Sequence, residues 1–150
     1  MERVRIYEMP DCKMASSEIG MFGEQNFEQF NRWFSALPRD LFPKDFLFWD
    51  GDYSDRGGFH WLYRYEDGME VPEAFSVIDF KGGLYAVITG IDGQDNGEEQ
   101  AEVKRFLEEY GFERDDSRPE LGNVITPPQA ADVLGYFQMD YYTPIRKKLK

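Results

Sequence analysis

Residues 75–90, FSVIDFKGGLYAVITG, decide the fold that we expect for this chain. The segments on either side of Gly82-Gly83 are rich in β-branched and aromatic residues, which favour strands. The glycine pair itself is better explained by a turn between strands than by a phosphate-binding loop. The stretch therefore predicts a strand, a tight turn and a second strand that ends at Gly90.

The chain opens with the same order of elements. Residues 4–10 have the period-two pattern of a strand, and Pro10-Asp11 predicts a turn. A second strand is predicted from about Lys13 to Ile19, with Gly20 at its end. Strand, turn, strand and glycine thus occur twice at nearly the same lengths.

A helix is predicted after each pair of strands. In the first half, the apolar residues at helical spacing are Phe27, Phe30, Phe34 and Leu37, and Pro38 ends the pattern. In the second half, they are Val103, Phe106, Leu107 and Tyr110. Asn96 is the expected N-cap of this second helix, and Gly111 occupies the position of a left-handed C-cap.

Two further strands are predicted to close each half. The first pair covers residues 46–50 and 59–65, with a turn-rich segment over 50–58 between them. The second pair is a short strand near 123–125 and a long strand over 134–142, which leads to Pro144-Ile145. Each half therefore has two strands after its helix, as in a β-α-β-β unit.

The predicted fold class is α+β. A single helix on a few strands buries too small a core, so the two halves, about 1–72 and 73–150, are expected to share one sheet in a single domain. We expect a duplicated β-α-β-β motif with a curved, mainly antiparallel and partly barrel-like sheet and two helices. A ligand cleft is expected between the halves, because clefts of this kind are common ligand positions.

Composition predicts a soluble protein. The chain has 150 residues, of which 41% are hydrophobic and 31% are charged, as is typical of a globular domain. Its longest apolar runs, 46–49 and 84–88, are too short to cross a bilayer, and the N-terminus has no signal-peptide core. We therefore expect a cytoplasmic protein without a membrane partner.

Cysteine, histidine and charge exclude several kinds of site. Cys12 and His60 are the only residues of their types, which excludes an internal disulfide and a zinc site of Cys and His ligands. No cofactor-binding motif is present, so we expect neither a metal nor a cofactor. The net charge of −12 repels phosphates, so we expect no direct nucleic-acid partner, whereas a basic protein partner stays open.

Aromatic residues supply candidates for a binding pocket. The chain has 13 Phe, 9 Tyr and 3 Trp, and the polar tips of so many Tyr and Trp need partners. By strand parity, Phe59, Trp61, Tyr63 and Tyr65 share one face, which either lines a pocket or packs on a helix. Trp33 either closes the pocket from the first helix or belongs to the core.

The last predicted strand supplies an acidic candidate. Asp140 shares a face with Tyr136 and Tyr142, so its carboxylate either pairs with a ligand cation or faces solvent. An aromatic pocket with one acid would select a ligand by charge and shape, because a cation over a ring gains about 0.5–2 kcal/mol.

Three stretches of the chain resemble one known family. Residues 4–10 look like its opening strand with a terminal proline, and residues 80–87 are similar to its glycine and Tyr-Ala-Val strand. Residues 139–145 look like its closing strand, which ends in Pro-Ile or Pro-Val. In order and spacing these stretches resemble the GyrI-like or AraC-type effector-binding domains of bacterial transcription activators over about residues 4–145.

The resemblance implies the duplicated fold and a cavity between its halves in which aromatic rings and a buried acid hold lipophilic, often cationic, drugs. Tyr85 stands at a family position that often faces this cavity. A few members of this family resemble hydrolases that open strained, cyclopropane-containing molecules, and others bind DNA gyrase. No helix pair precedes Val4, so we expect a free-standing domain without a DNA-binding part.

The chain departs from the family in one element. Where the family often has Pro-x-x-Glu-x-Tyr, with a glutamate that meets the ligand, this chain reads Pro119-Glu120-Leu121-Gly122-Asn123-Val124. Gly122 stands at the position of the glutamate and Val124 at that of the tyrosine. Glu120 is nearby, but strand parity places it away from the ligand, so another acid would have to substitute.

These observations predict a module that binds a small lipophilic, cationic or neutral, organic molecule. The expected ligand-binding residues are Tyr85, Tyr63, Trp61, Tyr65, Asp140, Tyr142, Trp33 and Glu120. A hydrolase of strained small molecules is the alternative, with Glu120, Asp140, Tyr63 or Tyr85 as the groups available for proton transfer. A module that binds gyrase or another protein stays open, as does a homodimer.

Overall fold

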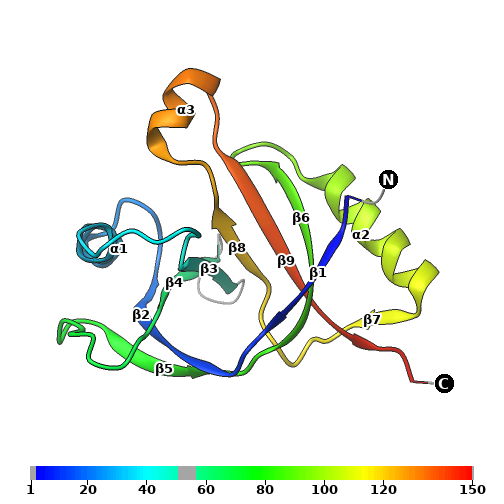
Figure 1. Ribbon diagram of the computed structural model, residues 1–150, viewed down its shortest axis with the longest axis horizontal. Coiled ribbons are helices and arrows are strands. Elements are labelled where there is room, and N and C mark those ends of the chain that lie inside the picture. Colours follow the sequence, from blue (N-terminus) through cyan, green and yellow to red (C-terminus); the bar gives the residue numbers. More distant parts are fainter. Residues whose placement is uncertain (1–2, 51–56, 150) are drawn as a thin grey trace. The chain divides into compact units, whose positions relative to one another are not determined.

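The computed structural model describes residues 3–50 and 57–149 (Figure 1). Within these residues the chain forms nine strands and three helices, which confirms the α+β class. The strands are β1 (Arg5–Met9), β2 (Cys12–Gly20), β3 (Asp45–Asp50), β4 (Gly58–Arg64), β5 (Ser76–Phe80), β6 (Gly83–Ile91), β7 (Phe112–Arg114), β8 (Leu121–Val124) and β9 (Gln138–Lys147). The helices are α1 (Gln25–Ser35), α2 (Gly97–Tyr110) and α3 (Pro128–Leu134). Most of the turn-rich segment predicted over 50–58 lies outside the described residues.

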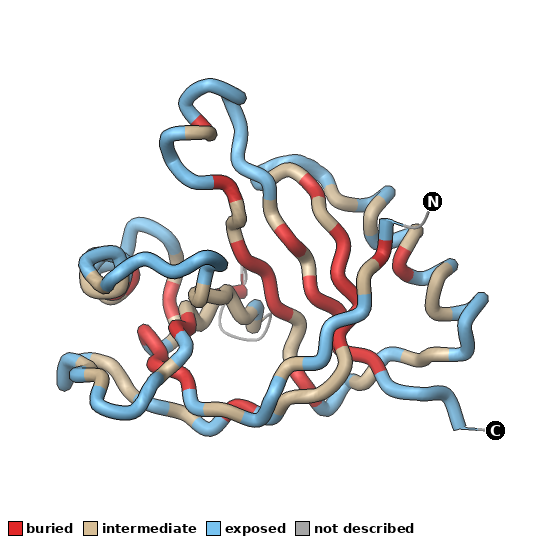
Figure 2. The backbone as a smooth tube through the Cα atoms, viewed as in Figure 1, coloured by how far each residue is buried: buried red, intermediate tan, exposed pale blue. Residues whose placement is uncertain are grey.

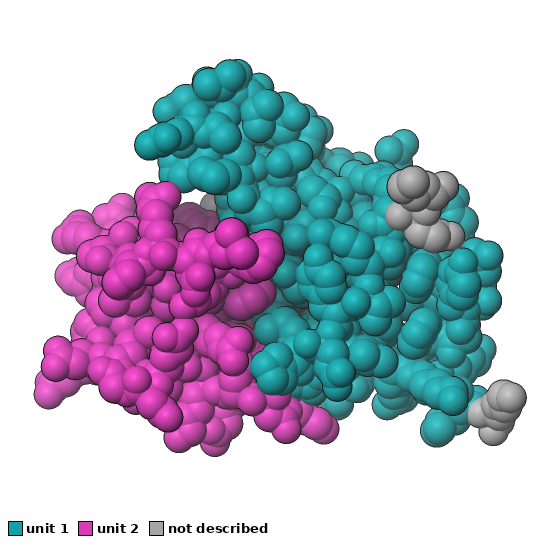
Figure 3. All heavy atoms as spheres, viewed as in Figure 1, with its two compact units in different colours: residues 1–10, 82–150 teal, residues 11–81 magenta. Residues whose placement is uncertain are grey.

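The chain divides into two compact units (Figure 3). Unit 1 consists of Met1–Pro10 and Gly82–Lys150, and unit 2 of Asp11–Lys81. The sequence predicted tight turns between β1 and β2 and between β5 and β6, but the two strands of each predicted pair lie in different units. Instead, β1 pairs with β6 and β2 pairs with β5. Pro10-Asp11 and Lys81-Gly82 connect the units and do not close hairpins, which corrects the predicted turns.

Glycine at position 82 explains part of this arrangement. A Cβ atom built on Gly82 would collide with the backbone of Met9 and Pro10 at the end of β1. Only a residue without a side chain lets the two backbone segments approach so closely. The glycine pair therefore serves the pairing of β1 with β6 and not a turn after β5.

In unit 1, the strands pair in the order β1-β6-β9-β8, and β7 pairs with the far end of β9. The pairs are antiparallel, and the sheet of this unit is open. Buried residues are concentrated on β6, β8 and β9 (Figure 2). These strands place alternate side chains on two faces, of which one packs against α2.

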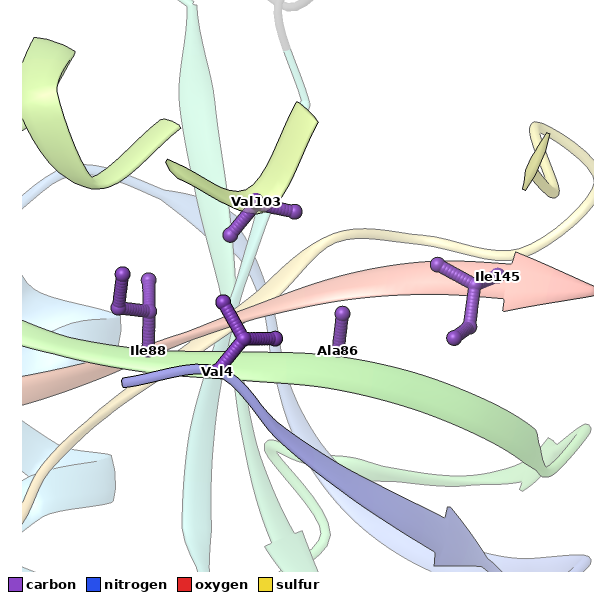
Figure 4. Packing of buried hydrophobic residues seen from close by; sticks show 5 residues of the cluster. All are labelled: Val4, Ala86, Ile88, Val103 and Ile145. Atoms are coloured by element: carbon purple, nitrogen blue, oxygen red, sulfur yellow. The ribbon is translucent and has the colours of Figure 1, made fainter. Parts of the chain in front are cut away.

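The face beneath α2 carries the apolar core of unit 1. Its buried members are Val4, Ala86, Ile88, Val103 and Ile145, and Val103 reaches from α2 toward the strand residues (Figure 4). The helix ends as predicted, since Gly111 has a left-handed φ of 79° and its N–H donates to the carbonyl of Leu107. Asn96 occupies the N-cap position, without a side-chain capping hydrogen bond.

In unit 2, the strands pair in the order β3-β4-β2-β5, also antiparallel, and α1 packs on one face. Phe27 and Phe30 on α1 are buried, as their helical spacing predicts. Ala15 on β2 and Tyr63 on β4 lie opposite each other and pack beneath the helix. Aromatic residues thus fill much of the core of this unit.

The segment before β9 differs from the prediction of a strand over 134–142. Residues 128–134 form α3, and β9 begins only at Gln138. Pro128 suits the first turn of a helix because its fixed φ is helical and its missing N–H is not needed there. Gly135, with φ of 84°, ends the helix by donating its N–H to the carbonyl of Ala131 at 2.8 Å. The described residues therefore contain three helices, one more than the two that the sequence predicted.

No helix in the described part of the chain is long and apolar enough to span a membrane.

The core of unit 1 gives a first testable prediction. Ile88 is fully buried in the cluster beneath α2, so Ile88→Ala should lower the free energy of unfolding by about 2–5 kcal/mol through lost burial and a cavity. Val133→Ala on α3 is the matched control, because Val133 is 87% exposed and its truncation should change stability by less than about 0.5 kcal/mol. Chemical denaturation measures both, and equal effects would contradict this description of the core.

Candidate ligand-binding face of unit 1

The second face of the unit 1 sheet, opposite α2, is aromatic and polar. Residues that lie opposite each other on paired strands share a face, so the strand registers define its members. We call this surface the tyrosine face; its residues are Arg5, Tyr7, Tyr85, Val87, Thr89, Leu121, Asn123, Asp140, Tyr142 and Pro144. It brings together side chains from β1, β6, β8 and β9.

The tyrosine face is ordered in rows that run across the strands. One row is polar and consists of Thr89, Asp140 and Asn123 on β6, β9 and β8. The neighbouring row contains Tyr142, with Val87 on one side and Leu121 on the other. The polar groups therefore lie at one end of the face and the aromatic rings at the other.

Asp140 is the acidic residue of this face, and the residue is only 5% exposed. Arg5 Nη2 donates a hydrogen bond to Asp140 Oδ1 at 2.8 Å, and Thr89 Oγ1 donates to the same oxygen at 2.6 Å. A buried carboxylate is stable only when it is paired and hydrogen-bonded. The pair with Arg5 meets this need, while the side chain of Arg5 stays 40% exposed.

Asn123 lies directly opposite Asp140 on β8 and is 3% exposed. Its side-chain oxygen, Oδ1, is buried and accepts no hydrogen bond from the residues that the structure describes. An unsatisfied buried acceptor costs about 1–3 kcal/mol. The polar row thus holds an acceptor that the described part of the protein does not use.

Three tyrosines form the aromatic end of the face. The ring of Tyr142 meets that of Tyr85 edge-on, with centroids 6.0 Å apart and an interplanar angle of 74°. The ring centroid of Tyr7 lies 6.4 Å from that of Tyr142, and Tyr7 is 41% exposed. Burial raises the pKa of Tyr142, and nearby Asp140 raises it further, so its phenol stays protonated near neutral pH.

Tyr85 is fixed from beneath by the segment before β8. Its hydroxyl donates to the carbonyl of Pro119 at 3.0 Å, and the guanidinium of Arg118 lies 4.9 Å from the ring centroid. Burial raises the pKa of Tyr85 to about 12, and the opposing effect of Arg118 is smaller. The proton of Tyr85 is therefore held in a structural hydrogen bond.

Arg118 is itself buried and ties this segment to the sheet. Its Nη2 donates to the carbonyls of Leu84 and Ile145 at 2.9 and 2.7 Å, and its Nε donates to Asp115 at 3.1 Å. Gly83 leaves room for the guanidinium, since a Cβ atom there would come within 2.6 Å of it. Arg118 thus holds Tyr85 in place through both the ring and the chain around Pro119.

The structure brings together three of the expected ligand-binding residues, Tyr85, Asp140 and Tyr142. Glu120 lies next to β8 but pairs with Arg114. Gly122 lies opposite Tyr141, on the face that packs against α2, and the side chain of Met139 fills the space where its Cβ would be. A glutamate at position 122 would therefore point away from the three tyrosines.

The other expected residues belong to unit 2, where Trp33 is part of α1 and Trp61 and Tyr63 pack beside this helix. Trp61 and Tyr63 contact Phe34, with ring centroids 5.2 and 5.4 Å apart, and Trp33 meets Tyr63 at 5.9 Å. Trp61 Nε1 donates to Asp45 at 3.1 Å, so its polar tip has a partner within the unit. Tyr65 follows β4 and is half-buried, and its N–H donates to the carbonyl of Lys13.

Sequence reasoning missed Arg5, Tyr7, Thr89 and Asn123. The alternation of Arg5 and Tyr7 along the first strand was visible, but their neighbours depend on the pairing of β1 with β6, which local sequence does not reveal. Asn123 could have been found by applying strand parity to Gly122, because residues adjacent in a strand face opposite sides.

Among the described residues no group of three or more His, Cys, Asp and Glu side chains could hold a metal ion. The tyrosine face offers instead one ion pair, one unused acceptor and aromatic rings.

Comparisons with solved structures place this fold among known ones. A hydrolase from Listeria innocua has a TM-score of 0.70 at 12% identity, with 97% of this chain and 93% of that chain covered. The C-terminal domain of EcmrR has a TM-score of 0.63 at 11% identity, with coverages of 96% and 97%. SAV2435 bound to tetraphenylphosphonium has a TM-score of 0.53 at 12% identity, with coverages of 97% and 94%. Neither a family model nor a curated protein matches the sequence.

These likenesses show a shared fold. The fold occurs in a hydrolase and in a protein that is bound to a lipophilic cation, so the choice between binding and catalysis depends on the groups of the site. Membership in the GyrI-like family stays a prediction.

The anchor of Tyr85 gives a prediction about pH. Hydrogen bonds from Ser117 and Arg118 lower the pKa of Asp115 to about 2, whereas an unfolded chain has a value of about 3.9. The stabilisation is therefore complete above pH 4 and is lost as the pH falls toward 2. Wild type should be more stable than Asp115→Asn at pH 5, and the difference should shrink at pH 3 in urea denaturation.

Glu108→Gln on the exposed side of α2 is the control for this series. A stability difference between wild type and Asp115→Asn that stays constant from pH 5 to pH 3 would contradict the proposed role of Asp115.

Proposed function

We propose that this protein binds a small lipophilic organic cation on the tyrosine face of unit 1. The observation that carries the proposal is the buried carboxylate of Asp140 on the same face as the rings of Tyr142, Tyr85 and Tyr7. The aromatic end suits the body of such a ligand and the polar row suits its charge. The shared fold with a tetraphenylphosphonium-bound protein supports the choice of ligand class.

Two energetic terms favour a cation over a neutral molecule. A cation near an aromatic ring gains about 0.5–2 kcal/mol, and more when water is excluded. Removing the cation from water costs several kcal/mol unless a carboxylate compensates its charge. Asp140 provides that compensation within the same face.

Arg5 is the internal competitor for Asp140. Its ion pair with Asp140 neutralises the carboxylate, but its side chain is 40% exposed and also contacts the hydroxyl of Tyr7. An arriving cation can take over the carboxylate while Arg5 moves into solvent. Arg5 and Tyr7 are the exposed members of the face, so we infer that the ligand approaches over β1.

The same contacts favour binding over hydrolysis. A general acid needs a proton to give, yet the hydroxyl proton of Tyr85 is used in the bond to Pro119. A general base needs an available carboxylate, yet Asp140 accepts from Thr89 and faces either Arg5 or, once Arg5 is displaced, the cationic group of the ligand. Glu120 pairs with Arg114. Hydrolysis is therefore the weaker candidate.

The proposal predicts a charge-dependent loss of affinity in Asp140→Asn. Tetraphenylphosphonium should bind the wild type, and the variant should bind it at least about tenfold more weakly, since a desolvated cation without a compensating carboxylate costs several kcal/mol. Triphenylphosphine oxide, which is aromatic but neutral, should bind both proteins equally. Isothermal titration calorimetry measures all four affinities.

Two further variants make the experiment decisive. Glu108→Gln removes one exposed negative charge from α2 and should leave both affinities unchanged. Arg5→Gln keeps the carboxylate and removes its competitor, so it should strengthen cation binding. Equal losses of cation affinity in Asp140→Asn and Glu108→Gln would show that only net charge matters and would contradict the proposed site. The absence of cation binding to wild type would contradict it as well.

A further inference from the structure

The unused acceptor of Asn123 narrows the chemistry of the ligand. Asn123 is 3% exposed, and its Oδ1 accepts no hydrogen bond among the described residues. The only other buried atom of this kind there is Arg118 Nη1, whose guanidinium lies against the ring of Tyr85. Asn123 Oδ1 has no such compensation.

The pairing of β8 with β9 places Asn123 next to the carboxylate of Asp140. Asn123 and Asp140 are paired residues of antiparallel strands, so their Cβ atoms lie about 5 Å apart on the same face. Both donors to Asp140, Arg5 and Thr89, come from strands on the side of Asp140 away from Asn123. A group that lies between Asn123 and Asp140 therefore meets one neutral acceptor and one negative charge.

We propose that the ligand carries an N–H donor on its cationic group, as in a primary or secondary ammonium, and that this N–H donates to Asn123 Oδ1. This inference rests on the proposed function and refines its ligand class. The ammonium charge faces Asp140, and the aromatic part of the ligand lies toward Tyr142. A quaternary cation has the charge but no donor, so it leaves Asn123 Oδ1 unsatisfied.

Sites that hydrogen-bond a ligand group discriminate against analogues that lack it, because the buried partner is then left unpaired. The face should thus distinguish two cations of equal charge and similar size by their N–H groups. Asp140 alone also favours an ammonium, since its N–H donates to the carboxylate, so the role of Asn123 is tested by the part of the preference that depends on its amide.

A matched pair of probes tests the inference by calorimetry. 2-(2-Naphthyl)ethylammonium carries three N–H donors, and its N,N,N-trimethyl analogue carries none. Wild type should bind the ammonium at least tenfold more tightly than the trimethyl analogue. Asn123→Leu should reduce this preference by weakening the binding of the ammonium alone, and Gln100→Leu on the exposed side of α2 should leave it unchanged.

The outcomes separate the two proposals. Equal binding of both probes to wild type would overturn the N–H donor and leave cation binding standing. Failure of both probes and of tetraphenylphosphonium to bind would overturn the proposed function itself. A preference that is as large in Asn123→Leu as in wild type would also overturn the role of Asn123, and Asn123→Ala provides the same comparison if the leucine variant does not fold.

A second readout is independent of any ligand. Because Asn123 Oδ1 is unsatisfied, Asn123→Leu should be at least as thermally stable as wild type, whereas loss of a satisfied amide would lower the melting temperature. A clear decrease in melting temperature would show that the amide is already used within the protein and would contradict the inference.

Discussion

The buried carboxylate of Asp140 is the interaction on which the candidate site of unit 1 depends. Asp140 is buried near the start of β9, between β6 and β8, where an unpaired charge would be strongly destabilising. Arg5 from β1 and Thr89 from β6 meet it, so a single acidic group links three strands of the sheet. Because the side chain of Arg5 is partly exposed, we propose that a ligand cation can replace it as the partner of Asp140. The ion pair that stabilises the free protein then marks the position of the ligand's charge.

The alternation of side chains along the strands explains how one sheet serves two purposes. Along β6, Ala86 and Ile88 pack beneath α2, while Tyr85, Val87 and Thr89 belong to the tyrosine face. A shift of the register by one residue would exchange the two sets. The core beneath α2 therefore fixes which residues form the candidate site, and Arg118 holds the aromatic end of that site against the sheet.

Local sequence predicted the elements well and their partners poorly. The period-two strands and the C-cap at Gly111 depend on near neighbours, and the structure confirms them. The stripe of α2 is confirmed for Val103, Phe106 and Leu107, whereas Tyr110 is 54% exposed. The pairing of β1 with β6, by contrast, is a long-range contact that no local pattern specifies. For the same reason Asp140 and Tyr142 could be named as candidates, while Arg5 and Thr89, which meet Asp140 only through the pairing of the strands, could not. The aromatic row of β4 was ambiguous in the sequence, and in unit 2 it packs beside α1.

Isotopic labelling of the tyrosine rings gives the most direct test of the binding site. In NMR spectra of the labelled protein, tetraphenylphosphonium should shift the ring signals of Tyr7 and Tyr142, each identified by its Tyr→Phe variant. The signal of Tyr110, exposed on α2, should stay in place. Saturable shifts confined to the tyrosine face are the expected result. Shifts of Tyr110 equal to those of Tyr142, or saturable binding that leaves Tyr7 and Tyr142 unchanged, would contradict the proposed site.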